Sequence, residues 1–159
     1  MKVFEKVIFV GKSATCREPM AMELLKKEPL RYSIEVEAKG LVVLFPEPLN
    51  QKAEAVMISN GIHLENYESS QLETSDFAEN TLILTFDREV KEKVLELEGA
   101  QNVYVLTDVT GDELEILDPY GAELITYGLC YETLTKTIGK LAAVLNEGTF
   151  FVSQEIPEG

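Results

Sequence analysis

The feature that most constrains the fold of this sequence is an apolar strand followed by a short loop and a helix start. Residues 7–10, Val-Ile-Phe-Val, suit a buried strand, and residues 11–18 are mostly small or polar. Pro19 precedes a helix-forming run, and we predict it at the first helical position, where its missing N–H has no intrahelical partner anyway. A strand, a loop and a helix N-terminus in this order form an anion cradle, in which backbone N–H groups face a phosphate. Arg17 adds a guanidinium that can bind a tetrahedral oxyanion through two parallel hydrogen bonds.

The rest of the chain alternates between predicted strands and predicted helices. Further strands are predicted at 33–38, 81–86 and 102–106, helices at 50–61, 87–99 and after Gly121, and a short helix after Thr74. The last helix carries apolar residues in steps of three and four, which predicts one face packed on the sheet: Leu124, Tyr127, Tyr131, Leu134, Ile138, Leu141 and Leu145. Strands separated by helices imply parallel pairing and a three-layer α/β/α sandwich. Ligands of such sheets bind outside the carboxyl ends of the strands, so the topology allows the first loop, Asp87 and the loop at 118–121 to meet.

The amino-acid composition limits the number of domains, the location and the partners that we expect for this protein. A chain of 159 residues fits one domain, predicted at 1–147, with a C-terminal tail at 148–159. We expect a cytoplasmic protein, because no apolar run resembles a membrane span or a secretion signal. Two cysteines and one histidine predict neither a disulfide framework nor a zinc site, and we expect no metal and no cofactor. The net charge of −14 disfavours nucleic acids and anionic membranes as partners and favours solubility.

Two motifs resemble the low-molecular-weight protein tyrosine phosphatases, a family that includes related bacterial arsenate reductases. The family loop reads Val-Cys-x-Gly-Asn-x-Cys-Arg-Ser-Pro-Met-Ala, and residues 10–21 here read Val-Gly-Lys-Ser-Ala-Thr-Cys-Arg-Glu-Pro-Met-Ala. Residues 118–121, Asp-Pro-Tyr-Gly, are similar to a second family motif, and residues 127–131 resemble its Tyr-x-x-Cys-Tyr helix. The resemblance covers residues 2–147. It implies a phosphotyrosine protein phosphatase I-like fold with a four-stranded parallel sheet in the order 2-1-3-4.

The resemblance also implies a role for each matching residue. In the family, a loop cysteine attacks phosphorus as a thiolate, an arginine binds the equatorial oxygens, and the aspartate of Asp-Pro acts as general acid. By position, Arg17 is the oxyanion clamp, Asp118 the general acid and Tyr120 a wall of the pocket. The anion would be a phosphate- or sulfate-like group or a phosphorylated partner. It would be held by Lys12, Ser13, Ala14, Thr15, Cys16 and Arg17.

Four residues of the loop depart from the family pattern. The nucleophile position is Gly11, which has no side chain to attack with. Ser13 and Ala14 replace the family's Gly and Asn, and Glu18 replaces the Ser after the arginine. A carboxylate there suits the helix dipole, and it can neutralise the guanidinium or fill the anion site. These departures predict a member that has lost phosphocysteine chemistry.

Other interpretations of the same residues stay open at this point. Cys16, Ser13 or Thr15 could replace the missing nucleophile, although Cys16 also suits a buried, inert thiol. Asp118 could serve only as a turn residue before Pro119, and Arg17 could form a buried ion pair. Three hypotheses follow: a non-catalytic binding or regulatory module, a phosphate-ester hydrolase that uses Arg17 and Asp118 without a phosphocysteine, and a ligand-free structural domain.

Overall fold

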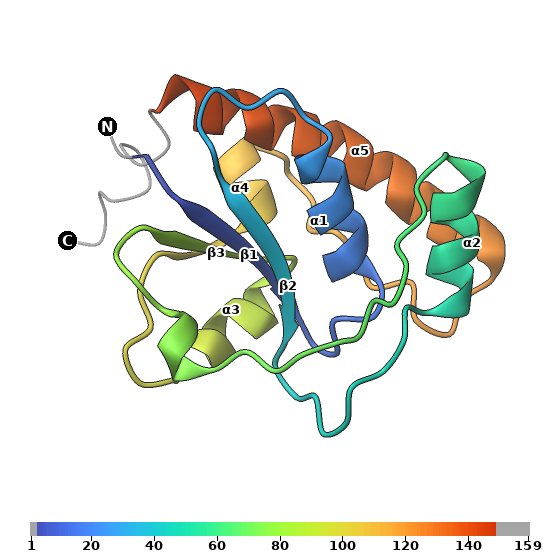
Figure 1. The fold of residues 1–159 in the computed structure, drawn as a ribbon, viewed down its shortest axis with the longest axis horizontal. Coiled ribbons are helices and arrows are strands. Elements are labelled where there is room, and N and C mark those ends of the chain that lie inside the picture. The colour runs from blue at the N-terminus through green and yellow to red at the C-terminus, as the bar shows by residue number, and fades with distance from the viewer. Residues whose placement is uncertain (1–2, 149–159) are drawn as a thin grey trace.

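The computed structural model describes residues 3–148. The strands are β1 (Lys6–Gly11), β2 (Glu35–Gly40), β3 (Thr81–Thr85) and β4 (Val103–Val105). The helices are α1 (Arg17–Lys26), α2 (Gln51–Ser59), α3 (Arg88–Leu95), α4 (Leu106–Thr110) and α5 (Leu124–Glu147), with a 3₁₀ turn, η1, at Thr74–Asp76 (Figure 1). Within residues 3–148, no helix is both long and apolar enough to cross a bilayer.

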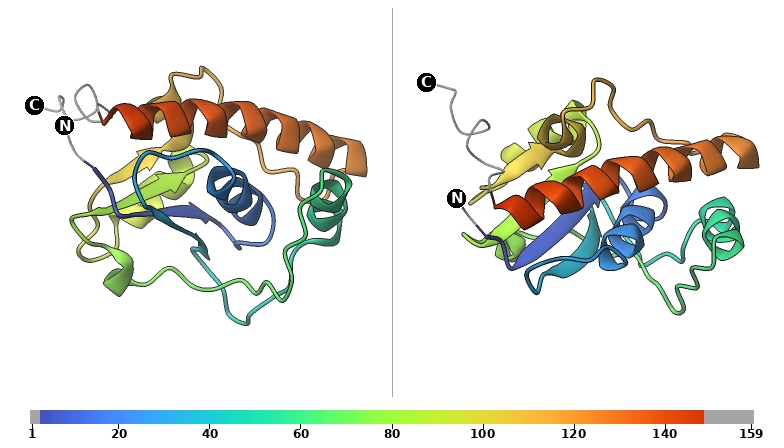
Figure 2. Two further views of the ribbon diagram at one scale, coloured as in Figure 1. Left: turned by 45° about the horizontal axis from the view of Figure 1, so that its top comes forward. Right: turned by 90° about the horizontal axis from the view of Figure 1, so that it is seen from above.

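The four strands form one parallel sheet in the order β2-β1-β3-β4, which confirms the predicted architecture. Successive residues of β1 point to opposite faces of the sheet. Val7 and Phe9 pack into a core shared with α1 and α5, whereas Ile8 and Val10 pack into a second core shared with α3. The long helix α5 contacts α1, α2 and α4 (Figure 2). The carboxyl end of β1, an inner strand of the sheet, leads directly into the loop before α1.

Capping residues fix several helix ends as predicted. The Asn50 side chain accepts hydrogen bonds from the first turn of α2, and Gly61 follows that helix with a φ of 82°. Asp87 caps α3 by accepting from the N–H of Val90 at 2.9 Å. The prediction for Pro19 is wrong, because α1 begins at Arg17 and Pro19 occupies the third position. Proline is tolerated there because none of the first four N–H groups of a helix has an intrahelical partner.

Other boundaries differ from the sequence prediction. The strand predicted at 33–38 runs instead from Glu35 to Gly40, and α3 ends at Leu95 rather than near Gly99. Helix α4 lies where the sequence predicts no helix, and its β-branched Val and Thr residues are weak helix formers. Six of the seven predicted apolar positions of α5 are buried, and Leu124, in the first turn, is half exposed. Residues 149–159 of the predicted tail lie outside the described residues.

Gly40, the last residue of β2, lies against the backbone of the loop after β1. A Cβ at this position would stand 2.9 Å from the carbonyl carbon of Ser13 and 3.2 Å from the nitrogen of Ala14. We expect Gly40→Ala to lower the free energy of unfolding by about 1–3 kcal/mol, because a neighbouring backbone cannot move aside as a side-chain tip can. Urea unfolding followed by circular dichroism measures this loss.

Gly128 supplies the control for this substitution. It lies inside α5, and a Cβ there would meet nothing within 4 Å. Gly128→Ala is expected to raise the free energy of unfolding by about 0.5–1 kcal/mol through helix propensity. Equal losses in the two variants would contradict the close approach of Gly40 to the loop.

Candidate anion site

Arg17 joins three segments at the carboxyl end of the sheet. Its side chain is only 2% exposed, and its guanidinium donates to the carbonyl of Ile116 at 2.6 Å. Nη1 lies 3.6 Å from Oδ2 of Asp87, and Nη2 lies 3.7 Å from Oδ2 of Asp118. The guanidinium also stands over the ring of Phe86, with 5.0 Å to the ring centroid. The segments that the topology allowed to meet therefore do meet, around a buried cation that two carboxylates already neutralise.

Glu18 fills the cradle formed by the loop after β1. Its side chain is 3% exposed and turns back toward the loop. Oε2 accepts a hydrogen bond from the N–H of Ala14 at 3.2 Å, and Oε1 accepts one from the N–H of Cys16 at 3.4 Å. These N–H groups belong to the predicted anion-binding loop. A carboxylate of the chain itself thus holds the donors that the sequence assigned to a phosphate.

Gly11, the position predicted to have lost the nucleophile, lies directly against this carboxylate. A Cβ added at Gly11 would stand 2.6 Å from Cδ and 3.1 Å from Cγ of Glu18, and it would overlap Oε2. Carbon atoms do not approach so closely without displacement of one of them. The buried position of Glu18 therefore requires that residue 11 carry no side chain.

The environment of Glu18 is unfavourable for its charge in one respect and favourable in others. Burial raises the pKa of the Glu18 carboxyl, because the ionised form loses its contact with water. Its own N–H, the Arg17 guanidinium and the loop N–H groups oppose this rise by stabilising the carboxylate. The loop thus supplies Glu18 with the same kind of donors that it would offer to an anion from solution.

Bonds outside the cradle hold the loop in this conformation. Ala14 has a φ of 63°, which is uncommon for a residue with a side chain. Its carbonyl accepts a hydrogen bond of 2.6 Å from the hydroxyl of Tyr67, and the carbonyl of Thr15 accepts one of 2.9 Å from the N–H of Asn50. The hydroxyls of Thr15 and Ser13 lie 3.0 Å apart. No local sequence pattern indicates the role of Tyr67, because its bond to the loop joins residues 53 positions apart.

The two thiols are poorly suited to nucleophilic attack. Cys16 is 6% exposed, and burial raises its pKa far above the ordinary value. Burial also raises the pKa of Cys130 to about 11, and its Sγ lies 3.9 Å from the carbonyl of Leu117. A protonated thiol is a weak nucleophile. The environment of Cys16 therefore favours the interpretation as an inert, buried thiol.

The remaining predicted site residues lie farther out. Asp118 accepts from the N–H of Tyr120 at 3.1 Å, so it combines a turn role with its ion pair to Arg17. Tyr120 is 78% exposed, and the surface pocket that it lines also contains Asn50 but no residue of the 11–18 loop. Lys12 and Ser13 are exposed on the outer side of the loop. Of the residues predicted to surround the anion, Asp118 thus lies beside Arg17, whereas Tyr120, Lys12 and Ser13 are exposed.

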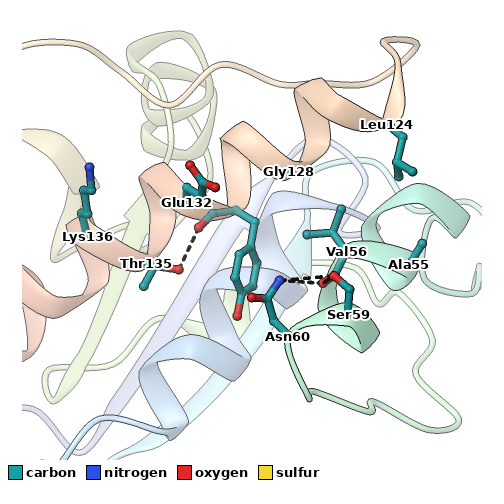
Figure 3. A pocket seen from close by; sticks show the side chains of 10 residues that line it. Ala55, Val56, Ser59, Asn60, Leu124, Gly128, Glu132, Thr135 and Lys136 are labelled. Atoms are coloured by element: carbon teal, nitrogen blue, oxygen red, sulfur yellow. Dashed lines mark hydrogen bonds between the residues drawn. The ribbon is translucent and has the colours of Figure 1, made fainter.

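Another pocket lies apart from this site. It has a volume of about 660 Å³, and it is lined by residues of α2, such as Val56 and Ser59, and by Gly128, Glu132 and Lys136 of α5 (Figure 3). It contains no residue of the 11–18 loop. Among residues 3–148, no group of three or more His, Cys, Asp or Glu side chains is arranged to hold a metal ion. What the loop after β1 can do chemically therefore depends mainly on Gly11, Arg17 and Glu18.

Comparison with known proteins shows which family model, relatives and solved structures this chain resembles. A family model described as low molecular weight phosphotyrosine protein phosphatase matches residues 6–149. A protein-arginine-phosphatase of Geobacillus stearothermophilus is 30% identical over 145 residues, which are 88% of this chain and 95% of that protein. The low molecular weight protein-tyrosine-phosphatase PtpB of Staphylococcus aureus is 28% identical over 141 residues, covering 88% and 99% of the two chains. A solved structure of the YwlE arginine phosphatase, a cysteine-to-serine mutant with a phosphorylated active-site serine, has a TM-score of 0.78 and 28% identity, covering 88% of this chain and 95% of that one.

Proposed function

This chain belongs to the low molecular weight phosphotyrosine protein phosphatase family, and we propose that it is a non-catalytic member whose phosphate cradle is closed by its own Glu18. The overlap between Glu18 and the position of a side chain at Gly11 carries this proposal. Phosphocysteine chemistry needs a thiolate at that point and an empty cradle beside it. Gly11 supplies no thiolate, and Glu18 takes the cradle. The protein then serves as a binding or regulatory module built on a phosphatase fold.

A hydrolase that uses Arg17 and Asp118 without a phosphocysteine is less well supported. Arg17 is buried, donates a hydrogen bond to Ile116 and pairs with Asp87 and Asp118, so its charge is already balanced by carboxylates of the chain itself. Asp118 is held by the same ion pair. The arrangement of Arg17 instead favours a structural role, as the alternative interpretation of the sequence stated.

The first test of the proposal is an assay of the purified chain with p-nitrophenyl phosphate. We expect no turnover above that of the buffer, because a nucleophile is missing and the cradle is filled. The Asp118→Asn variant serves as the control for a trace of contaminating phosphatase. Turnover by the unaltered chain that disappears in Asp118→Asn would contradict the non-catalytic assignment.

Substitution of Glu18 tests the closed cradle directly. In Glu18→Ala, the N–H groups of Ala14 and Cys16 lose their acceptor, and inorganic phosphate or sulfate can take its place. Phosphate at about ten times its Kd is expected to stabilise this variant by about 1.4 kcal/mol, and to leave the unaltered chain unchanged. Thermal unfolding at several phosphate concentrations measures the difference.

Glu89 provides the matched control for this experiment. It occupies the second position of α3, as Glu18 does in α1, but its side chain is exposed. Glu89→Ala should therefore gain no stability from phosphate. Equal gains in Glu18→Ala and Glu89→Ala would show a general effect of salt and would contradict the closed cradle.

A further inference from the structure

Exposed apolar side chains are concentrated in two stretches of the chain, around residues 42–45 and around residues 114–129. Of the twelve large hydrophobic residues that are exposed within residues 3–148, six lie between positions 114 and 129. They are Leu114, Leu117, Tyr120, Leu124, Ile125 and Leu129. Single exposed apolar residues are ordinary on a protein surface, but a group of them is typical of an interaction site.

Three of these residues line one groove beside α5, which we call the 114–129 groove. It has a volume of about 380 Å³ and lies between the loop at 114–119 and the helix residues Thr126, Leu129, Cys130 and Thr133. Leu114 and Leu117 are 81% and 82% exposed, and Leu129 is 57% exposed. Ile125 precedes Leu129 by one helical turn and extends the same face of α5. The groove therefore offers an apolar surface of the kind that a partner's side chain can fill.

The same stretch carries negative charge only. Residues 114–129 contain three acidic residues and no lysine or arginine. The acidic residues are Glu115, Asp118 and Glu123. Glu115 and Asp118 belong to the lining of the groove itself, and of these two Asp118 also pairs with the buried Arg17. Because the whole chain carries a net charge of −14, a second copy of it would be repelled at long range.

We propose that the 114–129 groove is a docking site for a basic, amphipathic segment of a partner protein. Apolar side chains of that segment fill the groove beside Leu114, Leu117 and Leu129, and its lysine or arginine residues face the surrounding carboxylates. This partner chemistry follows from charge complementarity together with the apolar lining. The proposal does not depend on the closed cradle, because neither Gly11 nor Glu18 takes part in the groove.

A labelled peptide tests the proposal with the full-length chain. The probe is an amphipathic helical peptide of Leu and Lys, and the matched probe replaces each Lys with Glu. Fluorescence anisotropy at about 50 mM and about 500 mM salt separates the electrostatic part of binding from the apolar part. We expect the Leu/Lys peptide to bind with a Kd of about 10–100 μM at low salt and more weakly at high salt, and the Leu/Glu peptide not to bind.

Variants of exposed leucines locate the binding surface. The Leu117→Ser, Leu129→Ser variant should weaken binding by about tenfold or more, because it removes apolar contacts. The control is Leu44→Ser, Phe45→Ser, whose residues are as exposed but lie in another loop. Circular dichroism is the check that both variants keep the fold.

Several results would overturn the proposal. They are the absence of binding by the Leu/Lys peptide, equal binding of the Leu/Glu peptide, and equal weakening by the Leu44→Ser, Phe45→Ser control. A dimer in sedimentation that Leu117→Ser, Leu129→Ser abolishes would assign the groove to a second copy of the chain. Tighter peptide binding in a Phe150→Ser, Phe151→Ser variant would assign it to the chain's own C-terminal residues.

Discussion

Gly11→Cys is expected to lower the free energy of unfolding by about 3 kcal/mol, because the new side chain and the Glu18 carboxylate cannot occupy the same space. Either the cysteine is forced into a strained position or Glu18 is pushed away from the N–H groups of Ala14 and Cys16. For a chain of this length, the loss corresponds to a fall in Tm of about 6–12 °C. Urea unfolding and a thermal scan measure both quantities.

A double-mutant cycle with Glu18→Ser isolates the overlap from other effects of the substitution. Glu18→Ser alone leaves loop N–H groups without their acceptor, so it is also expected to destabilise, by about 1–3 kcal/mol. In the double variant the two losses should not add, and we expect a favourable coupling of about 2 kcal/mol. Gly128→Cys, with open space around the new side chain, controls for the thiol itself and should change stability by less than about 1 kcal/mol. Simple additivity in the cycle would contradict the mutual exclusion of the two side chains.

The same double variant reports on the rest of the pocket. Turnover of p-nitrophenyl phosphate by Gly11→Cys, Glu18→Ser would mean that Arg17 and Asp118 still suit phosphate-ester chemistry. Continued inactivity would point to Ser13 and Ala14, which replace the family's Gly and Asn. This assay therefore distinguishes a site that lacks only its nucleophile from a loop that has been remodelled.

Arg17→Ala is expected to have an effect of similar size, a loss of about 3 kcal/mol in the free energy of unfolding. The buried guanidinium bonds to Ile116 and lies near Asp87 and Asp118, so its removal leaves these groups without their partner. Both carboxylates are partly exposed, which keeps the expected loss at the lower end of the range for buried ion pairs. Chemical unfolding of the variant measures the loss.

Arg88 offers a comparison at the surface. It lies 3.1 Å from Asp108, closer than Arg17 lies to either of its carboxylates, but its side chain is 55% exposed. Arg88→Ala should cost no more than about 1 kcal/mol, because water already stabilises both charges. If the two arginine variants lose the same stability, burial is not what makes Arg17 important to the fold.

The architecture could be predicted from the sequence because its signals are local or periodic. The apolar run before Gly11, the caps at Asn50 and Asp87 and the spaced apolar residues of α5 each report a strand, a helix start or a buried face. The resemblance to a known family then fixed the strand order. Nothing in the sequence indicated α4, because most of its residues have weak helix propensity. The predicted start of α1 was also misplaced, because proline is tolerated at more than one position of the first helical turn.

The candidate site was predictable only in part. The sequence indicated that Gly11 has no nucleophile and that Glu18 either neutralises Arg17 or fills the anion site. The structure places the carboxylate on the loop N–H groups, while Arg17 pairs with Asp87 and Asp118. Choosing between these outcomes requires the direction of a buried side chain. A linear motif does not contain that direction, and it gives no sign of the bond from Tyr67 to the loop.

The overlap of Gly11 with Glu18 also bears on how this lineage can change. A cysteine at position 11 beside an open cradle needs at least two substitutions, and each one alone gives a less stable protein. Cysteine first meets the carboxylate, whereas loss of the carboxylate first leaves the N–H groups of Ala14 and Cys16 without an acceptor. Because most domains have only a few kcal/mol of stability to lose, both one-step intermediates are at a disadvantage. Under the proposed function, the filled cradle therefore makes a stepwise return of a nucleophile energetically unfavourable.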